Sequence, residues 1–417
     1  MPGYAPKLAG RLFALLALGG VLGASWLLAV GFSAGVGHPY GGPLHDVGST
    51  LSVDERRTAL VALGLCYLVV IGCAIAGVLP RVPAIVTLIA AQLLFALSAI
   101  APGQDLFTYL GFARLAAVHD TNPYVEGLIA ARSDPLFALA AGSWRRTTTP
   151  YGPLFTLITL GVTPLPVAVA AWTLKGILAT AMFGCCAVLA RIAREIDRDP
   201  TLAVVFLGLN PAVLVYALGK GHNDALTMLP VLIAIWLIVR GRDLAAGPAA
   251  VLAVGIKVTA ALMLPFFAIA ARSRRTLALG VAAASLIAAV ISYAAFGFEP
   301  INVLSSARRD QELIQADLSF IGLIGRGLGA DLSDVAERWG VAIFAGLYAG
   351  VLVAALRRPG EWIRWSGWAM LALLATSGAL FPWYLTWVLP LAALARDRAL
   401  QVATLVLSAA AIGVISF

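Results

Sequence analysis

The run TALVALGLCYLVVIGCAIAGVL, from Thr58 to Leu79, contains no charged residue and decides the class of fold. About 20 apolar residues in a helix cross the hydrocarbon core of a bilayer, and this run has that length. PAIVTLIAAQLLFALSAIA, from Pro83 to Ala101, follows after a short link that contains Arg81. Two such runs in succession predict a helical membrane protein, because a helix satisfies its own backbone polar groups in lipid.

The composition of the whole chain agrees with this prediction. Of its 417 residues, 61% are hydrophobic and 12% are charged, whereas soluble domains carry about 25% charged residues. The mean hydropathy is +0.92. The sequence lacks the alternating segments of about ten residues that a transmembrane β-barrel requires. The expected fold class is an all-α polytopic membrane protein with short interfacial helices on its outer face.

Apolar runs recur from one end of the chain to the other and predict 11 to 13 transmembrane helical segments. A further apolar stretch, 247–271, is interrupted at Lys257 and is expected to enter the membrane and return as a broken pair of short helices. The other predicted spans are 10–33, 58–79, 83–101, 165–190, 201–218, 223–240, 276–296, 337–356, 362–381, 383–395 and 399–416.

Short basic clusters between the spans set the expected orientation, because cytoplasmic loops are rich in Lys and Arg. They are Lys7 and Arg11; Arg81; Arg191, Arg194 and Arg198; Arg240 and Arg242; Arg272, Arg274 and Arg275; Arg357, Arg358 and Arg364; Arg396 and Arg398. This pattern predicts a cytoplasmic N-terminus in the plasma membrane, with Arg56 and Arg57 as exceptions at the edge of an outer loop. It also explains the net charge of +8 better than nucleic-acid binding does.

Four stretches fall on the predicted outer face: 34–57, 102–164, 219–222 and 297–336. The chain is expected to form one membrane domain, 1–417, with 102–164 as an outer catalytic loop. The apolar run after Lys7 is interpreted as an uncleaved first helix rather than a signal peptide. All four cysteines lie inside apolar runs and indicate packing rather than disulfides or metal binding.

QDLFTYLGFARLAAVHDTNPY, from Gln104 to Tyr124, places polar groups where a span should open into water. Asp105 follows the apolar run directly, and Tyr109 lies one turn later in a predicted interfacial helix. Asn122 and Pro123 should end that helix. Asp105 could be a helix-capping acid or a catalytic carboxylate. His119 and Asp120 are interpreted as loop residues.

A second polar cluster, SWRRTTTPYGPLF, runs from Ser143 to Phe155. Arg145 and Arg146 lie on the outer side, where positive charge is least expected. They are candidates for binding a lipid phosphate, and the alternative is a solvated pair at the membrane surface. Tyr151 lies in the Pro-Tyr-Gly-Pro turn that follows.

The third cluster, NPAVLVYALGKGHNDAL, runs from Asn210 to Leu226 and separates two spans by a polar knot. Ionisable residues at membrane depth are costly and usually functional, although a simple outer turn is the alternative. The knot contains the candidate ligands Lys220, His222, Asn223 and Asp224.

Three further features are ambiguous in the sequence. Lys257 is either a snorkelling residue or the tip of the re-entrant pair. The charges in 305–320 are typical of a solvated surface helix. Trp383 and Tyr384, in FPWYLTWVLP, are either part of an aromatic belt or stack on a sugar or polyprenyl chain.

The sequence lacks the motifs of several enzyme classes. The sequence has no GxxxxGK[ST], no HExxH and no GxSxG at a strand-to-helix turn. Its four histidines include no pair at ligand spacing, so we expect no zinc site.

The motifs together resemble the polyprenol-phosphate-mannose-dependent mannosyltransferases of the glycosyltransferase C superfamily, and in particular actinobacterial α-1,6-mannosyltransferases of lipomannan synthesis. The resemblance is carried, in order along the chain, by Asp105 with Tyr109, Asn122-Pro123-Tyr124, Trp144, Pro150-Tyr151-Gly152-Pro153, Asn210-Pro211, Gly221-His222-Asn223-Asp224, Lys257 and Pro382-Trp383-Tyr384.

This resemblance implies an inverting transfer of a sugar, mannose above all, from a polyprenyl-phosphate donor to a glycan or glycolipid acceptor on the outer face. Asp105 would be the base, with Asp46 as a rival by position. The implied donor ligands are Tyr109, Arg145, Arg146, Tyr151, Lys220, His222, Asn223, Asp224 and Lys257. Asn122, Tyr124, Trp383 and Tyr384 would contact acceptor or lipid.

No cofactor is required by this chemistry, and a divalent metal on Asp105 and Asp224 is the less favoured arrangement. A transporter or flippase of polyprenyl lipids or small molecules is the alternative function, since broken helices and buried charges also suit carriers. A carrier should show matching halves, however, and the segment from Asp105 to Phe155 has no counterpart in the second half.

Overall fold

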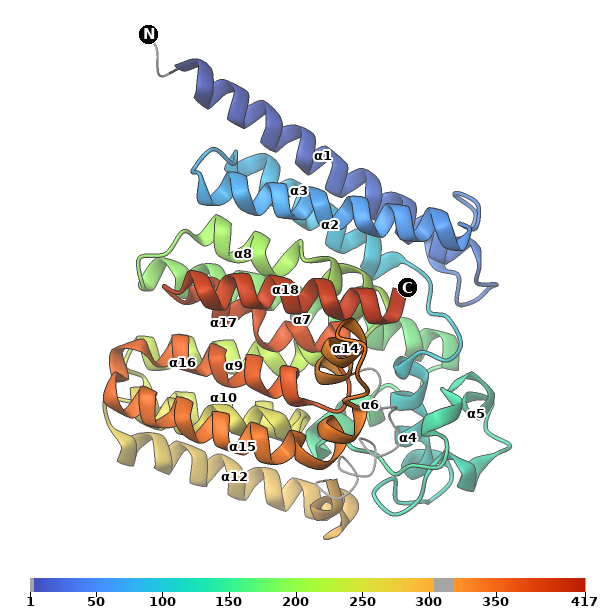
Figure 1. Ribbon diagram of the computed structural model, residues 1–417. Coiled ribbons are helices and arrows are strands. Elements are labelled where there is room, and N and C mark those ends of the chain that lie inside the picture. The colour runs from blue at the N-terminus through green and yellow to red at the C-terminus, as the bar shows by residue number, and fades with distance from the viewer. Residues whose placement is uncertain (1–3, 304–318, 417) are drawn as a thin grey trace.

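The computed structural model describes residues 4–303 and 319–416 (Figure 1), and in these ranges every regular element is a helix. This confirms the predicted all-α membrane fold. The charges of the predicted surface helix 305–320, which are Arg308, Arg309, Asp310, Glu312 and Asp317, lie outside the described residues.

Nine helices of the first half bear on the site. They are α1 (Tyr4–Ala34), α2 (Val53–Ile75), α3 (Arg81–Leu97), α4 (Asp105–Val118), α5 (Pro135–Leu139), α6 (Pro153–Leu160), α7 (Val167–Glu195), α8 (Pro200–Gly208) and the π-helix η4 (Ala212–Gly219). Short 3-10 helices lie between them: η1 (Gly42–Leu44), η2 (Leu128–Ala131) and η3 (Gly142–Trp144).

The second half continues with α9 (Asp224–Val239), α10 (Asp243–Ile256), η5 (Val258–Met263), α11 (Leu264–Ala270), α12 (Arg274–Phe296), η6 (Glu299–Asn302), α14 (Phe320–Gly327), α15 (Ser333–Arg357), η8 (Pro359–Glu361), α16 (Trp362–Thr376), η9 (Pro382–Trp387), α17 (Leu389–Leu394) and α18 (Arg398–Ser416). The long helices lie side by side, and α4, α5 and α6 gather at one end of them (Figure 1).

Five described helices are long and apolar enough to cross a membrane: Leu8–Ala34, Val53–Ile75, Val167–Glu195, Arg274–Phe296 and Asp334–Arg357. Helices α8 and η4 would together make a sixth span, bent by 59°. The prediction of 11 to 13 segments also included shorter apolar helices of the structure, such as α3, α9 and α18.

The bend between α8 and η4 follows from Asn210 and Pro211. Proline has no backbone N–H to donate, so the helix cannot continue unbroken. The Asn210 side chain is fully buried and accepts a hydrogen bond from the Ala212 backbone N–H at 2.9 Å. Its amide also donates to the Tyr67 hydroxyl at 3.3 Å. This break lets the chain turn into the polar knot after Gly219.

The break predicted at Lys257 is present, because α10 ends at Ile256 and Lys257 has an extended backbone. The chain then returns through η5 and α11 to the place where α10 began. There the Ser273 backbone N–H donates to the Asp243 carboxylate at 2.7 Å. The segment therefore enters and leaves at one end, as a re-entrant pair does.

The basic loops contact one another at the end of the helices opposite to Lys257. Arg364 pairs with Asp397 at 2.6 Å, and Arg240 lies 3.8 Å from Glu195. Arg198 donates to the Ala395 carbonyl at 2.8 Å. Loops far apart in the sequence thus share one side, which is the arrangement that the positive-inside rule requires.

Candidate active site

Asp105 is the first residue of α4 and makes two polar contacts. Its Oδ2 atom is 3.2 Å from His222 Nδ1, at ion-pair distance, and accepts a hydrogen bond from the Tyr109 hydroxyl at 3.4 Å. The side chain of Asp105 is 20% exposed. The carboxylate is therefore held by neighbours from two helix ends and keeps access to solvent.

Burial and neighbouring charges have opposite effects on the pKa of this carboxyl. Burial raises the pKa of Asp105, but His222 and then Lys257 favour the charged form and outweigh it, so the pKa lies below its usual range. Asp105 is consequently ionised at neutral pH, as a general base must be.

Helix α4 itself is more enclosed than an interfacial helix. All residues from Leu106 to Ala113 are buried. Tyr109 packs edge-on against Tyr151 and Phe155 of the next outer segment, with ring centroids 4.9 and 5.0 Å apart. Packing of Tyr109 therefore fixes the acid-bearing end of α4 on the side away from the cavity.

The polar knot at 220–224 brings His222 against Asp105 because of a glycine. Gly221 has a φ of +69°, and a Cβ there would meet Leu106 Cδ1 at 2.8 Å, so a side chain would be strained. His222 is 3% exposed and stacks on Trp383, with ring centroids 3.7 Å apart and an interplanar angle of 9°. Two motifs 160 residues apart therefore meet as one wall.

A buried ion pair lies beside this wall. Lys257 Nζ is 2.8 Å from Asp224 Oδ1, and the Trp387 indole N–H donates to the same oxygen at 2.8 Å. The Asp224 side chain is 1% exposed. Lys257 also lies over the rings of Tyr384 and Trp387, at 5.0 and 4.8 Å. Because Asp224 already has a cationic partner, a metal there would have to displace Lys257.

Asp105 opens into a cavity of about 610 Å³, within the range of small-molecule sites. Two cations, Arg56 and Lys220, lie in its lining. Burial lowers the pKa of Lys220, and the Asp105 carboxylate partly opposes that effect. The lining residues are Gly31, Phe32, Gly35, Val36, Thr50, Leu51, Arg56, Ala101, Pro102, Gly103, Gln104, Asp105, Lys220, His222 and Trp383.

Asn223 adds an unusual feature to the knot. It is completely buried, and both polar atoms of its side chain find no hydrogen-bond partner among the described residues. Asp224 Oδ2 likewise has no hydrogen-bond partner among the described residues. Buried polar groups are nearly always paired, and exceptions often mark functional sites.

The Pro-Tyr-Gly-Pro turn supports the site by docking on the re-entrant pair. The Gly152 backbone N–H donates to the Ile256 carbonyl at 3.0 Å, next to Lys257. A Cβ at Gly152 would meet the Gly255 carbonyl, so only glycine allows this approach. The turn therefore fixes Tyr151 and Lys257 relative to each other.

Asn122 and Tyr124, predicted to contact acceptor or lipid, make hydrogen bonds within the protein. Tyr124 is 2% exposed, and its hydroxyl bonds Thr156 at 2.8 Å. Asn122 donates to the Phe296 carbonyl at 2.8 Å and accepts from the Tyr124 backbone N–H at 3.0 Å. Neither lines the cavity, because both are used to hold the outer loop together.

Arg145 and Arg146 also lie away from the cavity lining. The Arg145 guanidinium donates to the carbonyls of Ala138 and Ala140 at 3.0 Å each and lies over the Phe137 ring. Arg146 is exposed. Arg145 therefore stabilises the conformation of its own loop. Neither arginine lies next to Asp105, although their charge on the predicted outer side suggested phosphate binding.

The rival acid Asp46 is 83% exposed in the α1–α2 loop and does not line the cavity. His119 lies in the loop that follows α4, where its Nε2 is 2.8 Å from Asp134. Arg114 binds the same carboxylate at 2.9 Å. Asp134 also caps α5, so this group is a structural clamp that the sequence did not indicate.

Sequence reasoning missed two residues at the site. Arg56 lines the cavity, and its presence as an outer exception to the charge rule was a usable signal. Trp387 holds Asp224, but nothing in the sequence distinguished it from an aromatic belt residue.

Known protein families match two parts of this chain. A family model described as alpha-(1->6)-mannopyranosyltransferase, N-terminal domain, matches residues 15–273, which is more than half of the chain. The chain belongs to this family. The resemblance inferred from the motifs is thereby confirmed. A second model, described as the MptB C-terminal domain, matches residues 320–416.

Two curated relatives of this mannopyranosyltransferase family are named alpha-(1->6)-mannopyranosyltransferase A. The protein of Corynebacterium glutamicum is 31% identical over 169 residues, which cover 39% of this chain and 34% of that protein. The protein of Mycobacterium tuberculosis is 28% identical over 327 residues, covering 71% and 62%. The chain thus spans less than two thirds of the length of either relative. No solved structure matches significantly.

The two family matches meet at the site of this mannopyranosyltransferase family member. Asp105, His222 and Lys257 lie in the first match, whereas Trp383 and Tyr384 lie in the second. The stacking of His222 on Trp383 joins the two parts.

Proposed function

We propose that the protein transfers a mannosyl group from a polyprenyl-phosphate donor to a hydroxyl of a glycan or glycolipid on the outer face of the plasma membrane. Asp105 is the general base. The observation that carries the proposal is the ionised, partly exposed Asp105 carboxylate in a cavity that also contains Arg56 and Lys220.

The reaction follows from this combination of charges. The acceptor hydroxyl gives its proton to Asp105 while its oxygen attacks the anomeric carbon. The bond from that carbon to the phosphate oxygen breaks, and the phosphate leaves with the electron pair. Attack from the face opposite the leaving group inverts the anomeric centre, so an α-linked product comes from a β-linked donor. A positioned base contributes roughly 10²- to 10⁴-fold to such a step.

The cations near Asp105 supply the other half of the chemistry. Arg56 and Lys220 are suited to bind the polyprenyl phosphate and to stabilise its charge as it leaves. Phosphate is a good leaving group, so no strong general acid is needed. Lys257 contributes through Asp224, which it neutralises in the wall beside the cavity.

Sugar recognition is assigned to the aromatic and amide groups of the same wall. Trp383 forms part of the cavity lining, where the apolar edge of its indole can contact a pyranose ring, because His222 and Phe381 already stack on its ring. The amide of Asn223, which has no hydrogen-bond partner among the described residues, is a further candidate for binding sugar hydroxyls. The names of the two relatives favour mannose and an α-(1→6) linkage.

The alternative, a transporter or flippase, makes a different experimental prediction. Purified protein given a labelled polyprenyl-phosphate mannose and a mannan acceptor should release polyprenyl phosphate and extend the acceptor. A carrier in sealed vesicles would move the donor between leaflets and leave its phosphate–sugar bond intact. Movement of intact donor without any release would refute the proposed transferase.

The outward orientation is tested separately. Ser49 is exposed in the α1–α2 loop, near the cavity residues Thr50 and Leu51. In a background with Cys66 replaced by alanine, Ser49→Cys should react with a membrane-impermeant maleimide added to intact cells. Labelling only after the cells are opened would place the cavity on the cytoplasmic side and contradict the proposal.

A further inference from the structure

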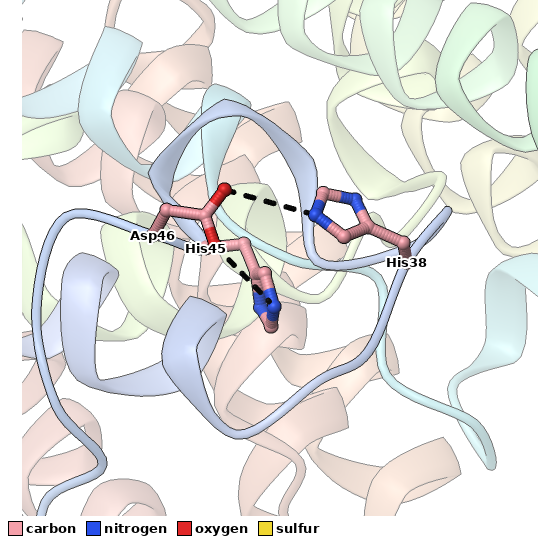
Figure 2. A group of neighbouring side chains, drawn as sticks. All are labelled: His38, His45 and Asp46. Atoms are coloured by element: carbon pink, nitrogen blue, oxygen red, sulfur yellow. Dashed lines mark ion pairs between the residues drawn. The ribbon is translucent and has the colours of Figure 1, made fainter.

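The α1–α2 loop brings together three side chains that the proposed transfer reaction does not use. They are His38, His45 and Asp46, drawn together in Figure 2. His38 Nε2 is 3.7 Å from Asp46 Oδ2, and His45 Nε2 is 3.8 Å from Asp46 Oδ1. The ligand atoms of all three lie within 4.8 Å of one another. We propose that His38, His45 and Asp46 bind a divalent transition-metal ion, Zn²⁺ by preference.

The contact of His45 with the protein fixes which nitrogen is available. Its Nδ1 atom lies 3.1 Å from the Ser33 backbone carbonyl. A carbonyl oxygen can only accept, so Nδ1 carries the proton and Nε2 keeps its lone pair. Metal-binding histidines usually donate their second ring nitrogen to a carbonyl or carboxylate in this way. The free Nε2 is the atom that faces Asp46.

The backbone that carries the three groups is already held in place. The Trp172 indole N–H donates to the Pro39 carbonyl at 3.2 Å, and the Ile100 backbone N–H donates to the Tyr40 carbonyl at 2.9 Å. Tyr40 also packs edge-on against Phe107 of α4, with centroids 5.0 Å apart. The loop therefore needs little ordering when an ion binds, which favours binding.

Glycine at position 41 permits the turn that brings the histidines together. A Cβ on Gly41 would lie 2.8 Å from His45 Nδ1 and would also meet the Val36 carbonyl. The planes of the two imidazole rings meet at 71°, with centroids 4.6 Å apart, although the residues are seven positions apart in the sequence.

The donor set selects the class of metal. Two imidazoles and one carboxylate suit zinc and related transition ions, and three protein ligands leave a fourth position for water. Tetrahedral ligands at zinc distances lie about 3.3 Å apart, so the group needs to contract only slightly. His38 and Asp46 are 67% and 83% exposed and are free to make that movement.

The location suggests what the ion does. Val36, Thr50 and Leu51 line the Asp105 cavity and lie on either side of the cluster in the same loop. An ion that ties His38 to Asp46 therefore braces a wall of the cavity. This role is independent of the transfer chemistry and does not rest on it.

The test is zinc binding by the full-length protein, purified in detergent without a histidine tag. Competition with a chromophoric zinc chelator should give one site per chain. His38→Ala, His45→Ala and Asp46→Asn should each weaken zinc binding by at least about tenfold, since even outer-shell partners are worth roughly 10- to 100-fold. Co²⁺ should give the visible spectrum of a tetrahedral site with the wild type and no such spectrum with His38→Ala, which should still fold because this side chain is 67% exposed.

Two matched controls separate this site from other surface binding. His119→Asn removes a histidine outside the cluster, and Asp54→Asn removes an exposed acid at the start of α2. Both should bind zinc as the wild type does. The proposal is overturned if the wild type competes for no zinc, or if His38→Ala and Asp46→Asn keep the wild-type affinity.

Discussion

Replacing Lys257 by methionine should destabilise the protein by an amount that the buried ion pair sets. Lys257 Nζ lies 2.8 Å from Asp224, whose side chain is 1% exposed. Methionine preserves the apolar stem and its contact with Tyr384 and Trp387 but leaves the carboxylate without a cation. Removing one partner of a buried pair costs about 3–5 kcal/mol. Because the Trp387 indole still donates to Asp224 at 2.8 Å, we expect the lower end, about 3 kcal/mol.

The second variant isolates the charge from the packing. Asp224→Asn combined with Lys257→Met removes both charges, so the double variant should recover most of the stability lost in Lys257→Met alone. The coupling between the two sites should be about 2 kcal/mol, the range expected for residues in contact. Lys257→Arg, which retains a cation, should lose less than Lys257→Met.

The assay is reversible unfolding by denaturant in detergent micelles. Lys220→Met is the matched control, because Lys220 lies over the Tyr216 ring at 4.8 Å and has no ion-pair contact within 4 Å among the described residues. It should cost about 1 kcal/mol. The reasoning is refuted if Lys257→Met is no more destabilising than Lys220→Met, or if the double variant is the sum of its single variants.

Three further predictions concern the cavity, the docking turn and the outer clamp. Arg56→Gln should raise KM for the polyprenyl-phosphate donor about tenfold, equivalent to about 1.4 kcal/mol, and should also lower kcat, because the leaving phosphate loses a stabilising cation; an equal effect of Arg57→Gln would contradict a specific role. Gly152→Ala should lower the free energy of unfolding by about 1–3 kcal/mol, because its Cβ meets the Gly255 carbonyl, whereas Gly142→Ala, with open space around it, should not. Asp134→Asn keeps a helix-capping side chain but removes the negative charge. In the wild type, burial opposes this charge, but His119 and Arg114 stabilise it more strongly, so the pKa of Asp134 is below its usual value. Its stabilising effect is present above the unfolded pKa, about 3.9, and is lost as pH falls through the folded pKa. Asp134→Asn should therefore destabilise by about 2 kcal/mol at pH 7 and match the wild type in strong acid; a gap that persists there would contradict this.

The sequence predicted the parts of the molecule that depend on local pattern. Uninterrupted apolar runs gave the membrane helices, and Asn210-Pro211 and Lys257 gave the two breaks, because proline and an intramembrane charge act on their own segment. The grouping of Asp105, His222 and Lys257 also followed, since the topology assigned the first two to one face.

What the sequence could not predict depends on packing between distant segments. Asn122 and Tyr124 fit a motif, but only the fold reveals that their polar groups are used by Phe296 and Thr156. Arg145 is similarly turned onto its own loop. The meeting of His38 with His45 needed the turn at Gly41, so ligand spacing along the chain gave no sign of it.

The most direct test of the account is the rate of a single turnover in Asp105→Asn. Asparagine keeps the size of the side chain and cannot take the acceptor proton. The rate of polyprenyl phosphate release, measured with saturating donor and acceptor, should fall roughly 10²- to 10⁴-fold. Asp54→Asn, an exposed acid outside the cavity, should keep the wild-type rate. A wild-type rate in Asp105→Asn would contradict the assignment of this residue as the base.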